Sequence, residues 1–452
     1  MSDNINLKRG LNVPVSGVAE RKLSKTIVPD IVAVKPTDFK GLTPKVLVHE
    51  GDRILAGSPV LADKANLSIL FTSPVSGTVK EIVRGEKRKL LEVRIEAAKT
   101  VEYVDFGIKD PEKMNAAEIK DALLASGLWP AIVQRPYGII ADPQIVPKAI
   151  FISSFNTAPL ANEIQFSLKD ETENLQAGIN ALSKLTEGGV HVSFNSKKTG
   201  ENPFRSLKNI TEHYFSGPHP AGNVGVQIHH IAPIIKGETV WTVAPHLVAA
   251  MGRLFRTGKS DLRRKVAVTG PKASGPSYIE TVSGFCMKDL AGLCDDKGGD
   301  VRYISGNVLT GANVGREGFL GFFDDQVTLL AEGNYHEMFG WGKPFRSKKF
   351  SFSHTYFSWL TPGRKYAMDT NLNGGVRAFV MSDVYSKVLP MQLYPVYLVK
   401  ACLAQDIDKM ERFGIYEVLP EDLALCEYIC PSKIEIQSIL EDGISLMMKE
   451  MA

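Results

Sequence analysis

The chain has 452 residues, of which 44% are hydrophobic and 23% charged, as in ordinary folded proteins of two to four domains. Its 53 basic and 50 acidic residues leave a net charge of only +3, which argues against a nucleic-acid-binding surface. Five cysteines, an odd number in a long chain, indicate a reducing compartment rather than a disulfide framework.

The N-terminal stretch has no apolar core of the kind found in signal peptides, so we expect none. No run approaches the length of a membrane span. Residues 46–96 then read as short β-runs cut by glycines, in two halves that are faintly alike. This pattern predicts a pseudo-twofold sandwich of short strands, similar to the biotinyl/lipoyl-like hammerhead fold.

Lipoyl carriers of that fold are modified on a lysine in an Asp-Lys-Ala tip. The chain has this tripeptide, with its lysine at Lys64. However, Lys64 lies too far before the return strand at Ser73-Pro74 for the spacing of a carrier. We therefore expect Lys64 to be an unmodified surface lysine in a loop.

The next region alternates helix-like and strand-like patterns. The expected elements are a helix from Asp110-Pro111 to Gly127, a strand over 149–155, a helix over 171–189, a strand over 190–194, and a strand and helix ending near 258. Such alternation predicts an α/β layer with a mainly parallel sheet, Rossmann-like in type. The region has no G-x-G-x-x-G or P-loop glycines, so we expect no nucleotide site of the usual kind.

Histidines are concentrated in this region. His213, His219, His229, His230 and His246 fall within 34 residues, but no H-E-x-x-H or C-x-x-C motif accompanies them, so we expect no metal site. A loop rich in glycine and proline, 217–233, leads into an expected β-run, on which the adjacent His229 and His230 would face opposite sides. Such a loop either approaches a ligand or another backbone closely, or is simply a turn.

Residues 261–332 return to β-runs around a short helix-like piece near 285–292, which predicts a β-grasp-like module. The segment 333–382 is aromatic and basic. Since the total charge is near neutral and no RNA-binding motif is present, we expect it to bind a partner or pack in the core. The remainder, from 383, is helical in pattern.

The C-terminal region contains Cys426-x3-Cys430-Pro431, the second half of the iron–sulfur signature C-x2-C-x2-C-x3-C-P. The first two ligand positions hold Pro420 and Leu423, so a [4Fe–4S] cluster would lack two thiolates. The other cysteines are scattered. We expect Cys426 and Cys430 to be reduced thiols one helical turn apart on one helix face. A cluster completed from elsewhere and a two-thiol metal or redox site are the alternatives.

The expected fold is therefore a multi-domain α+β and α/β chain without a self-contained active site. Its regions are an N-terminal region with the barrel-sandwich hammerhead (1–100), a Rossmann-like α/β domain (101–260), a β-grasp-like, soluble-ligand-binding module (261–332), an aromatic and basic connecting segment (333–382), and a C-terminal helical domain resembling a degenerate iron–sulfur domain (383–452).

Five motifs, in order along the chain, resemble a single family. They are LKRGLNVPVSG, the hammerhead stretch HEGDRILAGSPVL with FTSPVSGTV, GPHPAGNVGVQIHHIAP, WTVAPHLVAAMGRLFRTG and ISGNVLTG. The family is NqrA, the A subunit of the sodium-translocating NADH:quinone oxidoreductase. Wider kin are the electron-input subunits of the Rnf complex and of respiratory complex I, which carry a flavin site and a cluster domain. By this resemblance, residues 420–431 look like a cluster segment that kept its packing and lost two ligands.

The resemblance implies a peripheral subunit on the cytoplasmic side of the bacterial inner membrane. It would dock chiefly on the membrane-embedded B subunit and work beside the C, D, E and F subunits in a complex that oxidises NADH, reduces quinone and pumps sodium ions out. It also implies that this chain binds no cofactor, and that FAD, FMN, riboflavin and iron–sulfur or iron centres belong to the partner subunits. Two other functions compete: an electron-entry subunit that binds NADH, FMN and a cluster, and a purely structural scaffold.

If quinone contacts this chain, it requires an apolar slot with a few polar groups for its carbonyls. The candidate contacts are Trp129, Arg135, Tyr137, Phe155, His219 and Gly222. The rings would hold the head group, and Arg135 or His219 would donate a hydrogen bond to a carbonyl. The alternative is that these residues only pack the α/β domain. We expect no catalytic and no metal-binding residue.

Overall fold

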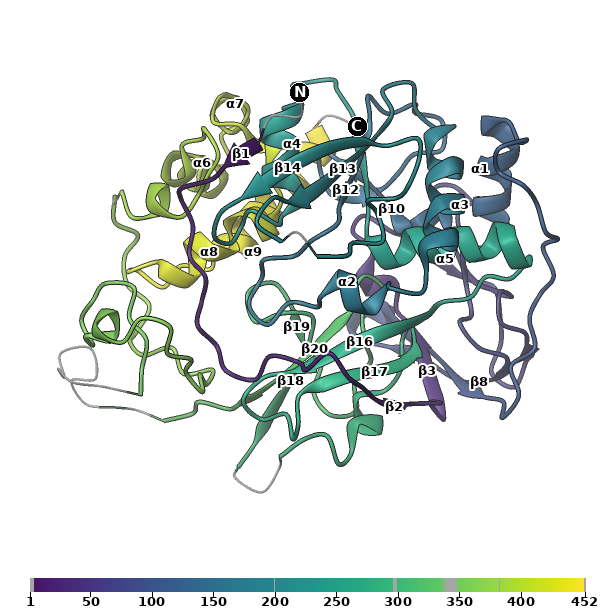
Figure 1. Cartoon of the computed structure of the whole chain (residues 1–452), viewed down its shortest axis with the longest axis horizontal. Helices are drawn as coiled ribbons and strands as arrows, with labels where there is room; N and C mark the ends of the chain where they lie inside the picture. The colour runs from purple at the N-terminus through teal and green to yellow at the C-terminus, as the bar shows by residue number, and fades with distance from the viewer. Residues whose placement is uncertain are drawn as a thin grey trace.

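The computed structural model describes residues 4–198, 200–295, 299–335, 337, 348–381 and 383–450. Within them the chain forms four β-sheets, of seven, six, four and three strands, and a C-terminal group of helices (Figure 1). The segment 333–382, which we expected to bind a partner or to pack in the core, is described only in part, because residues 336, 338–347 and 382 lie outside the described residues.

The seven-stranded sheet forms the centre of the molecule. Its strands, in spatial order, are β1 (Asn4–Asn6), β14 (Thr211–Ser216), β13 (Val190–Asn195), β12 (Ile150–Ser153), β15 (Val240–Val243), β10 (Ile132–Arg135) and β11 (Ile139–Ile140). All pairs from β1 to β15 are parallel, and β10 and β11 are added antiparallel. The mainly parallel α/β sheet predicted from the sequence is therefore confirmed.

The helices of this region, within the described residues, are α1 (Ala116–Ala125), α2 (Ile164–Ser167), α3 (Thr172–Ser183), α4 (Val224–Ile231) and α5 (Pro245–Thr257). Two sequence-based expectations were wrong. Helix α1 begins at Ala116 and not at Asp110, because Asn115 and Glu118 form a reciprocal capping box. The residues after the 217–223 loop form α4 and not a strand, so His229 and His230 lie on one helix.

The six-stranded sheet has the order β19 (Ala312–Asn313), β18 (Val301–Ser305), β20 (Gln326–Ala331), β16 (Arg263–Thr269), β17 (Ser277–Val282) and β2 (Leu23–Thr26). Strands β16 and β17 form the expected antiparallel hairpin. The helix-like piece is a short 3-10 helix, Met287–Leu290. The first strands of the chain do not pack only within the N-terminal region: β1 forms the edge of the seven-stranded sheet and β2 forms the edge of the six-stranded sheet.

The N-terminal strands form two small sheets. One contains β3 (Ile31–Val34), β9 (Leu90–Ala97), β8 (Gly77–Arg84) and β5 (Arg53–Ile54), and the other contains β4 (Pro44–Val46), β6 (Pro59–Asp63) and β7 (Leu70–Thr72). All the pairings within them are antiparallel. Lys64 lies exposed in the turn that follows β6, as expected for a surface lysine.

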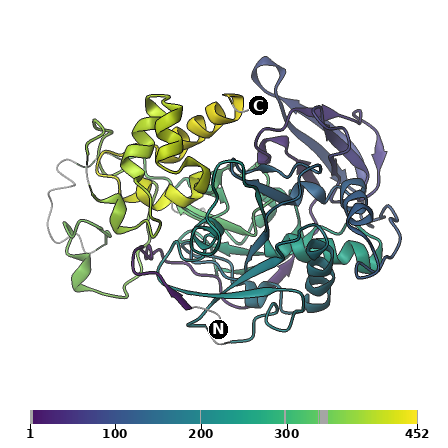
Figure 2. The same cartoon turned by 90° about the horizontal axis from the view of Figure 1, so that it is seen from above.

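The C-terminal region contains α6 (Pro395–Leu403), α7 (Ile407–Arg412), α8 (Pro420–Ile429) and α9 (Ile436–Glu450). Seen from above, these helices lie at the left and the N-terminal sheets at the upper right (Figure 2), and the two groups approach each other where Glu441 on α9 lies 3.9 Å from Lys40. The helices share one apolar core with the N-terminal segment and with the loops beside β12 and β14. Within the described residues, no helix is both long enough and apolar enough to cross a bilayer.

Candidate functional site

A buried ion cluster joins the central sheet to the C-terminal helices. Arg135, at the end of β10, is 1% exposed. Its Nη1 donates to Asp422 Oδ2 at 3.0 Å and its Nη2 donates to Glu421 Oε1 at 2.6 Å. Burial favours loss of the charge, but the two carboxylates outweigh it and raise the pKa of Arg135 above its ordinary value. Arg135 is therefore a charged link between β10 and α8.

The carboxylate partners are positioned by the first turn of α8. Asp422 is the third residue of this helix, and its Oδ2 accepts a hydrogen bond from the backbone N–H of the N-cap residue, Leu419, at 3.1 Å. Negative charge is stabilised at a helix N-terminus, where backbone N–H groups are unpaired. The start of α8 thus holds a buried carboxylate in place for Arg135.

Helix α4 lies directly on this ion pair. A Cβ atom at Gly225 would lie 2.3 Å from Asp422 Oδ2 and 2.4 Å from Arg135 Nη1. Beside it, Asn223 Nδ2 donates to the backbone oxygen of Glu421 at 3.1 Å. Any larger residue at position 225 would have to displace the ion pair, which explains one of the glycines in the loop motif.

The loop between β14 and α4 places His219 and Gly222 against Thr157. His219 is 3% exposed, its Nδ1 lies 3.2 Å from Thr157 Oγ1, and its backbone N–H donates to Asn12 Oδ1 at 2.9 Å. Burial lowers the pKa of His219 to about 4, so the ring is neutral at pH 7. A Cβ at Gly222 would lie 2.6 Å from the Thr157 nitrogen, so the close approach predicted for this loop is to another backbone.

The six residues predicted to contact quinone fall into two separate places. Trp129 is fully buried in the core of the α/β region, where its indole N–H donates to the Ala141 oxygen at 2.7 Å and its ring meets Trp241 edge-on at 5.5 Å. The other five face the C-terminal helices or the loop before α4. Tyr137, at φ 85°, lies edge-on to Tyr416 at 6.3 Å, and Phe155 is in the core shared with those helices.

One of the two histidines on α4, His229, also links this helix to the C-terminal region. His229 Nδ1 lies 2.6 Å from Glu417 Oε2, and its Nε2 accepts the Gln392 backbone N–H at 3.0 Å. Since Nε2 accepts, Nδ1 carries the proton and donates to the carboxylate. His230 instead contacts the Val226 oxygen of its own helix at 2.8 Å. In the described part of the chain, no three His, Cys, Asp or Glu residues are grouped to hold a metal ion.

The two cysteines of the half-signature are buried. Cys426 lies on α8 and Cys430 directly follows the helix, each 1% exposed, and the Tyr385 hydroxyl donates to Cys430 Sγ at 2.9 Å. Burial raises the pKa of Cys426, so its thiol is protonated at neutral pH. With Pro420 and Leu423 in the other two positions, these residues do not fit a four-thiolate cluster.

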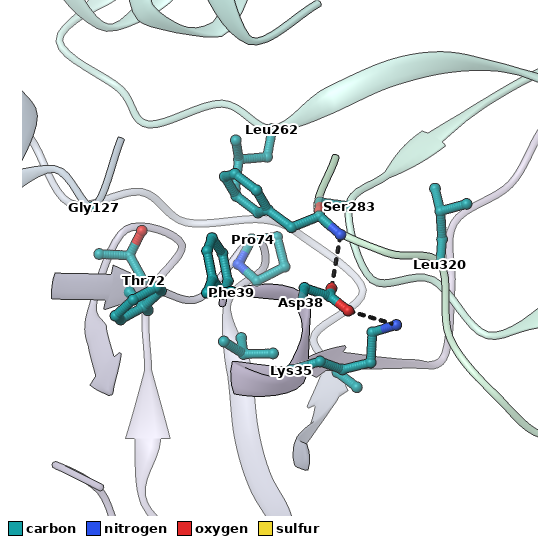
Figure 3. Close-up of a pocket in the computed structure, with 13 residues that line it drawn as sticks. Lys35, Asp38, Phe39, Thr72, Pro74, Gly127, Leu262, Ser283 and Leu320 are labelled. Carbon is teal, nitrogen blue, oxygen red and sulfur yellow. Dashed lines mark hydrogen bonds and ion pairs between the residues drawn. The ribbon is translucent and has the colours of Figure 1, made fainter. Parts of the chain in front are cut away.

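Cavities lined by described residues lie elsewhere. A large, open one, of about 1060 Å³, is lined by residues 350–356 and 368–373, the end of α8 and the edge of the six-stranded sheet. A small one, of about 30 Å³, has room for only one or two waters and lies between the N-terminal sheets and the 262–322 region (Figure 3). None of the six candidate residues lines either of these cavities.

The wall of the small cavity combines aromatic rings with one buried carboxyl group. Asp38 accepts the Phe322 backbone N–H at 2.8 Å and pairs with Lys35 Nζ at 3.1 Å (Figure 3). Burial outweighs both partners and raises the pKa of Asp38. The Phe39 ring meets the Phe71 ring at 4.7 Å. The cavity thus marks a packed contact between the N-terminal sandwich and the six-stranded sheet.

Three family models match the chain. They are described as the NqrA N-terminal barrel-sandwich hybrid domain over residues 5–98, the NqrA second alpha/beta domain over residues 114–260, and the NQRA C-terminal domain over residues 265–316. Together with the sheets described above, they define a multi-domain mixed α/β protein with an N-terminal barrel-sandwich domain and a second α/β domain.

Curated relatives match over the full length. The A subunit of the Na⁺-translocating NADH-quinone reductase of Rhodopirellula baltica is 34% identical over 98% of both chains. Those of Yersinia pestis (strain Angola) and Neisseria meningitidis serogroup A are each 35% identical over 99% of this chain and all of theirs. An NAD⁺-reducing [NiFe]-hydrogenase structure matches 74% of this chain and 67% of its own at 11% identity and a TM-score of 0.39, which supports no argument. The chain belongs to the NqrA family, the A subunits of the Na⁺-translocating NADH-quinone reductases.

Proposed function

We propose that this chain is the A subunit of a complex that oxidises NADH, reduces quinone and transports sodium ions. The observation that carries the proposal is the match of about 35% identity along the whole length of relatives with that name. As one subunit among several, the chain needs no complete active site of its own, in agreement with a sequence that lacks hydrolase and nucleotide-binding motifs.

In finer terms, the chain is a peripheral subunit on the cytoplasmic side of the inner membrane. It docks chiefly on the membrane-embedded B subunit and works beside the C, D, E and F subunits. The flavins and iron centres belong to those partners, and this chain binds none. This part of the proposal is supported by the two missing cluster ligands, because Pro420 and Leu423 stand where the first two cysteines of the signature would be.

A visible absorption spectrum and an iron assay of the chain, purified without oxygen, test the cofactor part. A colourless, iron-free protein is expected. A brown or yellow protein with stoichiometric iron or flavin would favour the competing function, an electron-entry subunit that binds NADH, FMN and a cluster.

We further propose that quinone contacts the junction around the β14–α4 loop. Of the six residues named from the sequence, Arg135, Tyr137, Phe155, His219 and Gly222 lie there, whereas Trp129 lies apart in the core of the α/β region. Support comes from the junction's chemistry, since a neutral imidazole and a guanidinium lie there among apolar side chains, as a quinone carbonyl requires. Arg135 already binds two carboxylates, so His219 is the better donor. A purely structural scaffold remains the competing function.

The experiment measures binding of a quinone analogue to the assembled complex. Tyr137→Ala, at a half-buried ring, and His219→Gln are expected to weaken binding about tenfold, with a matched control in Tyr394→Ala, whose ring is 65% exposed on the C-terminal helices. Trp129 is a poor test residue because its loss disrupts the core. Binding that is unchanged in both variants would favour the scaffold role. Binding lost only on Phe352→Ala would place the quinone in the large cavity.

The finer fold assignments belong to the same proposal. We propose a Rossmann-like domain at 101–260 and a β-grasp-like module at 261–332, preceded by the hammerhead region and followed by the connecting segment and the helical region. The parallel core of the central sheet and the antiparallel hairpin of the next sheet support these assignments. Expression of residues 101–260 with β1 supplied as a peptide tests the first boundary, because β1 completes that sheet.

A further inference from the structure

Residues 348–381 form a lobe at the edge of the molecule, below the C-terminal helices (Figure 1). The lobe has almost no regular structure, apart from a 3-10 turn at Ser358–Leu360. Its surface differs from the rest of the chain in both charge and apolar exposure. Neither property is used by the function proposed above.

The lobe has an excess of positive charge. It has five basic residues and one acidic residue, a net charge of +4, whereas the whole chain has only +3. Lys348, Arg364, Lys365 and Arg377 are exposed. The single acidic residue, Asp369, is already engaged: it accepts a hydrogen bond from the hydroxyl of Tyr335, which precedes the lobe, at 2.6 Å, and lies 3.9 Å from Lys349 Nζ. The formal charges exposed by the lobe are therefore all positive.

The same lobe exposes large apolar side chains. Trp359 is 52% exposed and Leu360 is 60% exposed, and they are followed within five residues by Arg364 and Lys365. A second loop of the lobe exposes Leu372, Val376, Val380 and Met381, each by at least half, around Arg377. Leu372, Val376 and Arg377 also lie at the wall of the large cavity. Lys349 Nζ donates to Asn373 Oδ1 at 2.8 Å, which holds this loop against the start of the lobe.

We propose that this lobe binds an anionic lipid surface. Tryptophan and aliphatic side chains partition into the boundary between head groups and acyl chains, and flanking lysine and arginine pair with anionic head groups. An acidic protein surface would satisfy the cations but not six exposed apolar side chains on two loops. The inference does not depend on whether the chain contacts quinone.

The lobe would thus orient the chain on the membrane. Trp359 and Leu360 enter the head-group region, while Arg364 and Lys365 lie at the phosphate level. Because Trp359 is stacked on His354, with ring centroids 6.1 Å apart, the apolar tip is pre-formed rather than created on binding. Electrostatic attraction of this kind is screened by salt, whereas the apolar contribution is not.

The test is co-sedimentation of the full-length chain with vesicles of phosphatidylcholine alone or with about 30% phosphatidylglycerol. Binding is expected only with the anionic vesicles and to fall with added salt. The Arg364→Gln/Lys365→Gln variant should bind about 25-fold more weakly, since each basic residue near such a surface contributes roughly a factor of five. Trp359→Ser/Leu360→Ser should also lose binding.

Matched controls separate the lobe from non-specific adsorption. Lys87→Gln/Arg88→Gln removes two adjacent basic residues from an exposed turn of the N-terminal sandwich, and Ile108→Ser removes a side chain that is 75% exposed. Both should bind like the unchanged chain. Equal binding to neutral and anionic vesicles, or an equal loss in lobe and control variants, would overturn the proposal. If lobe variants lose association with the partner subunits while no variant binds vesicles, the lobe contacts a protein and the proposal is wrong.

Discussion

The Arg135 ion cluster yields the sharpest structural prediction. Arg135→Met removes the guanidinium but keeps an apolar stem of similar length. Asp422, whose side chain is fully buried, then loses its charged partner. Removing one member of a buried pair costs about 3–5 kcal/mol, because the remaining charge is left without compensation in a medium that solvates it poorly. The expected result is a lower free energy of unfolding, because α8 is held less tightly against the central sheet.

The loss of stability is measured by unfolding the full-length chain in urea and monitoring the unfolding by the labelling of Cys426 and Cys430. Lys236→Met is the matched control, since the Lys236–Glu411 ion pair crosses the same junction with its lysine 57% exposed. Such an exposed pair contributes less than about 1 kcal/mol. The second variant, Arg135→Met/Asp422→Asn, keeps the α8 cap but removes the buried charge, and should recover part of the stability.

Either of two results would refute a buried, coupled ion pair at this junction. One is an Arg135→Met variant that unfolds at the same urea concentration as Lys236→Met. The other is a double variant that is destabilised by the full sum of its single changes, because this would mean that the two charges do not interact.

Other buried groups make further changes measurable. Gly225→Ala should destabilise the chain by about 1–3 kcal/mol through overpacking against the ion pair, and Trp129→Ala by about 3–5 kcal/mol through loss of core packing, both measured by urea unfolding. The pKa of His219 falls from 6.5 to about 4 on folding, so the unfolded chain binds more protons. Stability should therefore decrease by about 3 kcal/mol as the pH falls from 6.5 to 4, and His219→Gln should remove this part of the pH dependence. Cys426 and Cys430 should resist thiol reagents at about pH 8 until the chain unfolds.

Each of these predictions has a control or a contrary outcome. Gly375→Ala adds a Cβ with no atom within 4 Å and should be almost neutral, so an equal loss at Gly225 and Gly375 would contradict overpacking as the cause. An unchanged pH dependence in His219→Gln would contradict the burial of a neutral ring. Reaction of Cys426 in the native protein would show that the half-signature is accessible. If Trp129→Ala kept the native stability, Trp129 would not be needed for core packing, and a quinone-binding role would be favoured for it.

The sequence predicted the elements whose signals are local. The alternation of apolar strands and amphipathic helices from β12 to α5 was sufficient to predict a mainly parallel sheet, and the repeated glycines were sufficient for the N-terminal sandwich. The start of α1 was missed although its signal was present, because Asn115 followed by Glu118 is a capping pattern. The Asp-Pro pair at 110–111 was a weaker signal of the same kind.

Helix α4 is not predictable from local pattern. Val224, Val226 and Ile228 are β-branched and follow a loop rich in glycine and proline, which favours a strand. Burial of one face against the sheet and of Gly225 against the ion pair overrides this preference. Tertiary packing, which no window of sequence reports, decides such segments.

The site depends even more on distant partners. Arg135 and Asp422 are 287 positions apart, and nothing near either residue reveals the other. The sequence singled out Arg135, His219 and Gly222 for their chemistry, but it did not indicate that α8 would bind the first and Thr157 the other two. The contribution of residues 4–26 to two distant sheets was likewise invisible.

If this chain is a working subunit of a sodium-translocating NADH:quinone reductase, that activity must depend on it. The most direct test deletes the chain from cells and measures NADH-driven quinone reduction in their membranes with and without sodium, before and after the purified chain is added back. We predict that sodium-stimulated quinone reduction is lost on deletion and returns with the added chain. Quinone reduction that keeps its sodium stimulation without the chain would contradict the proposed function.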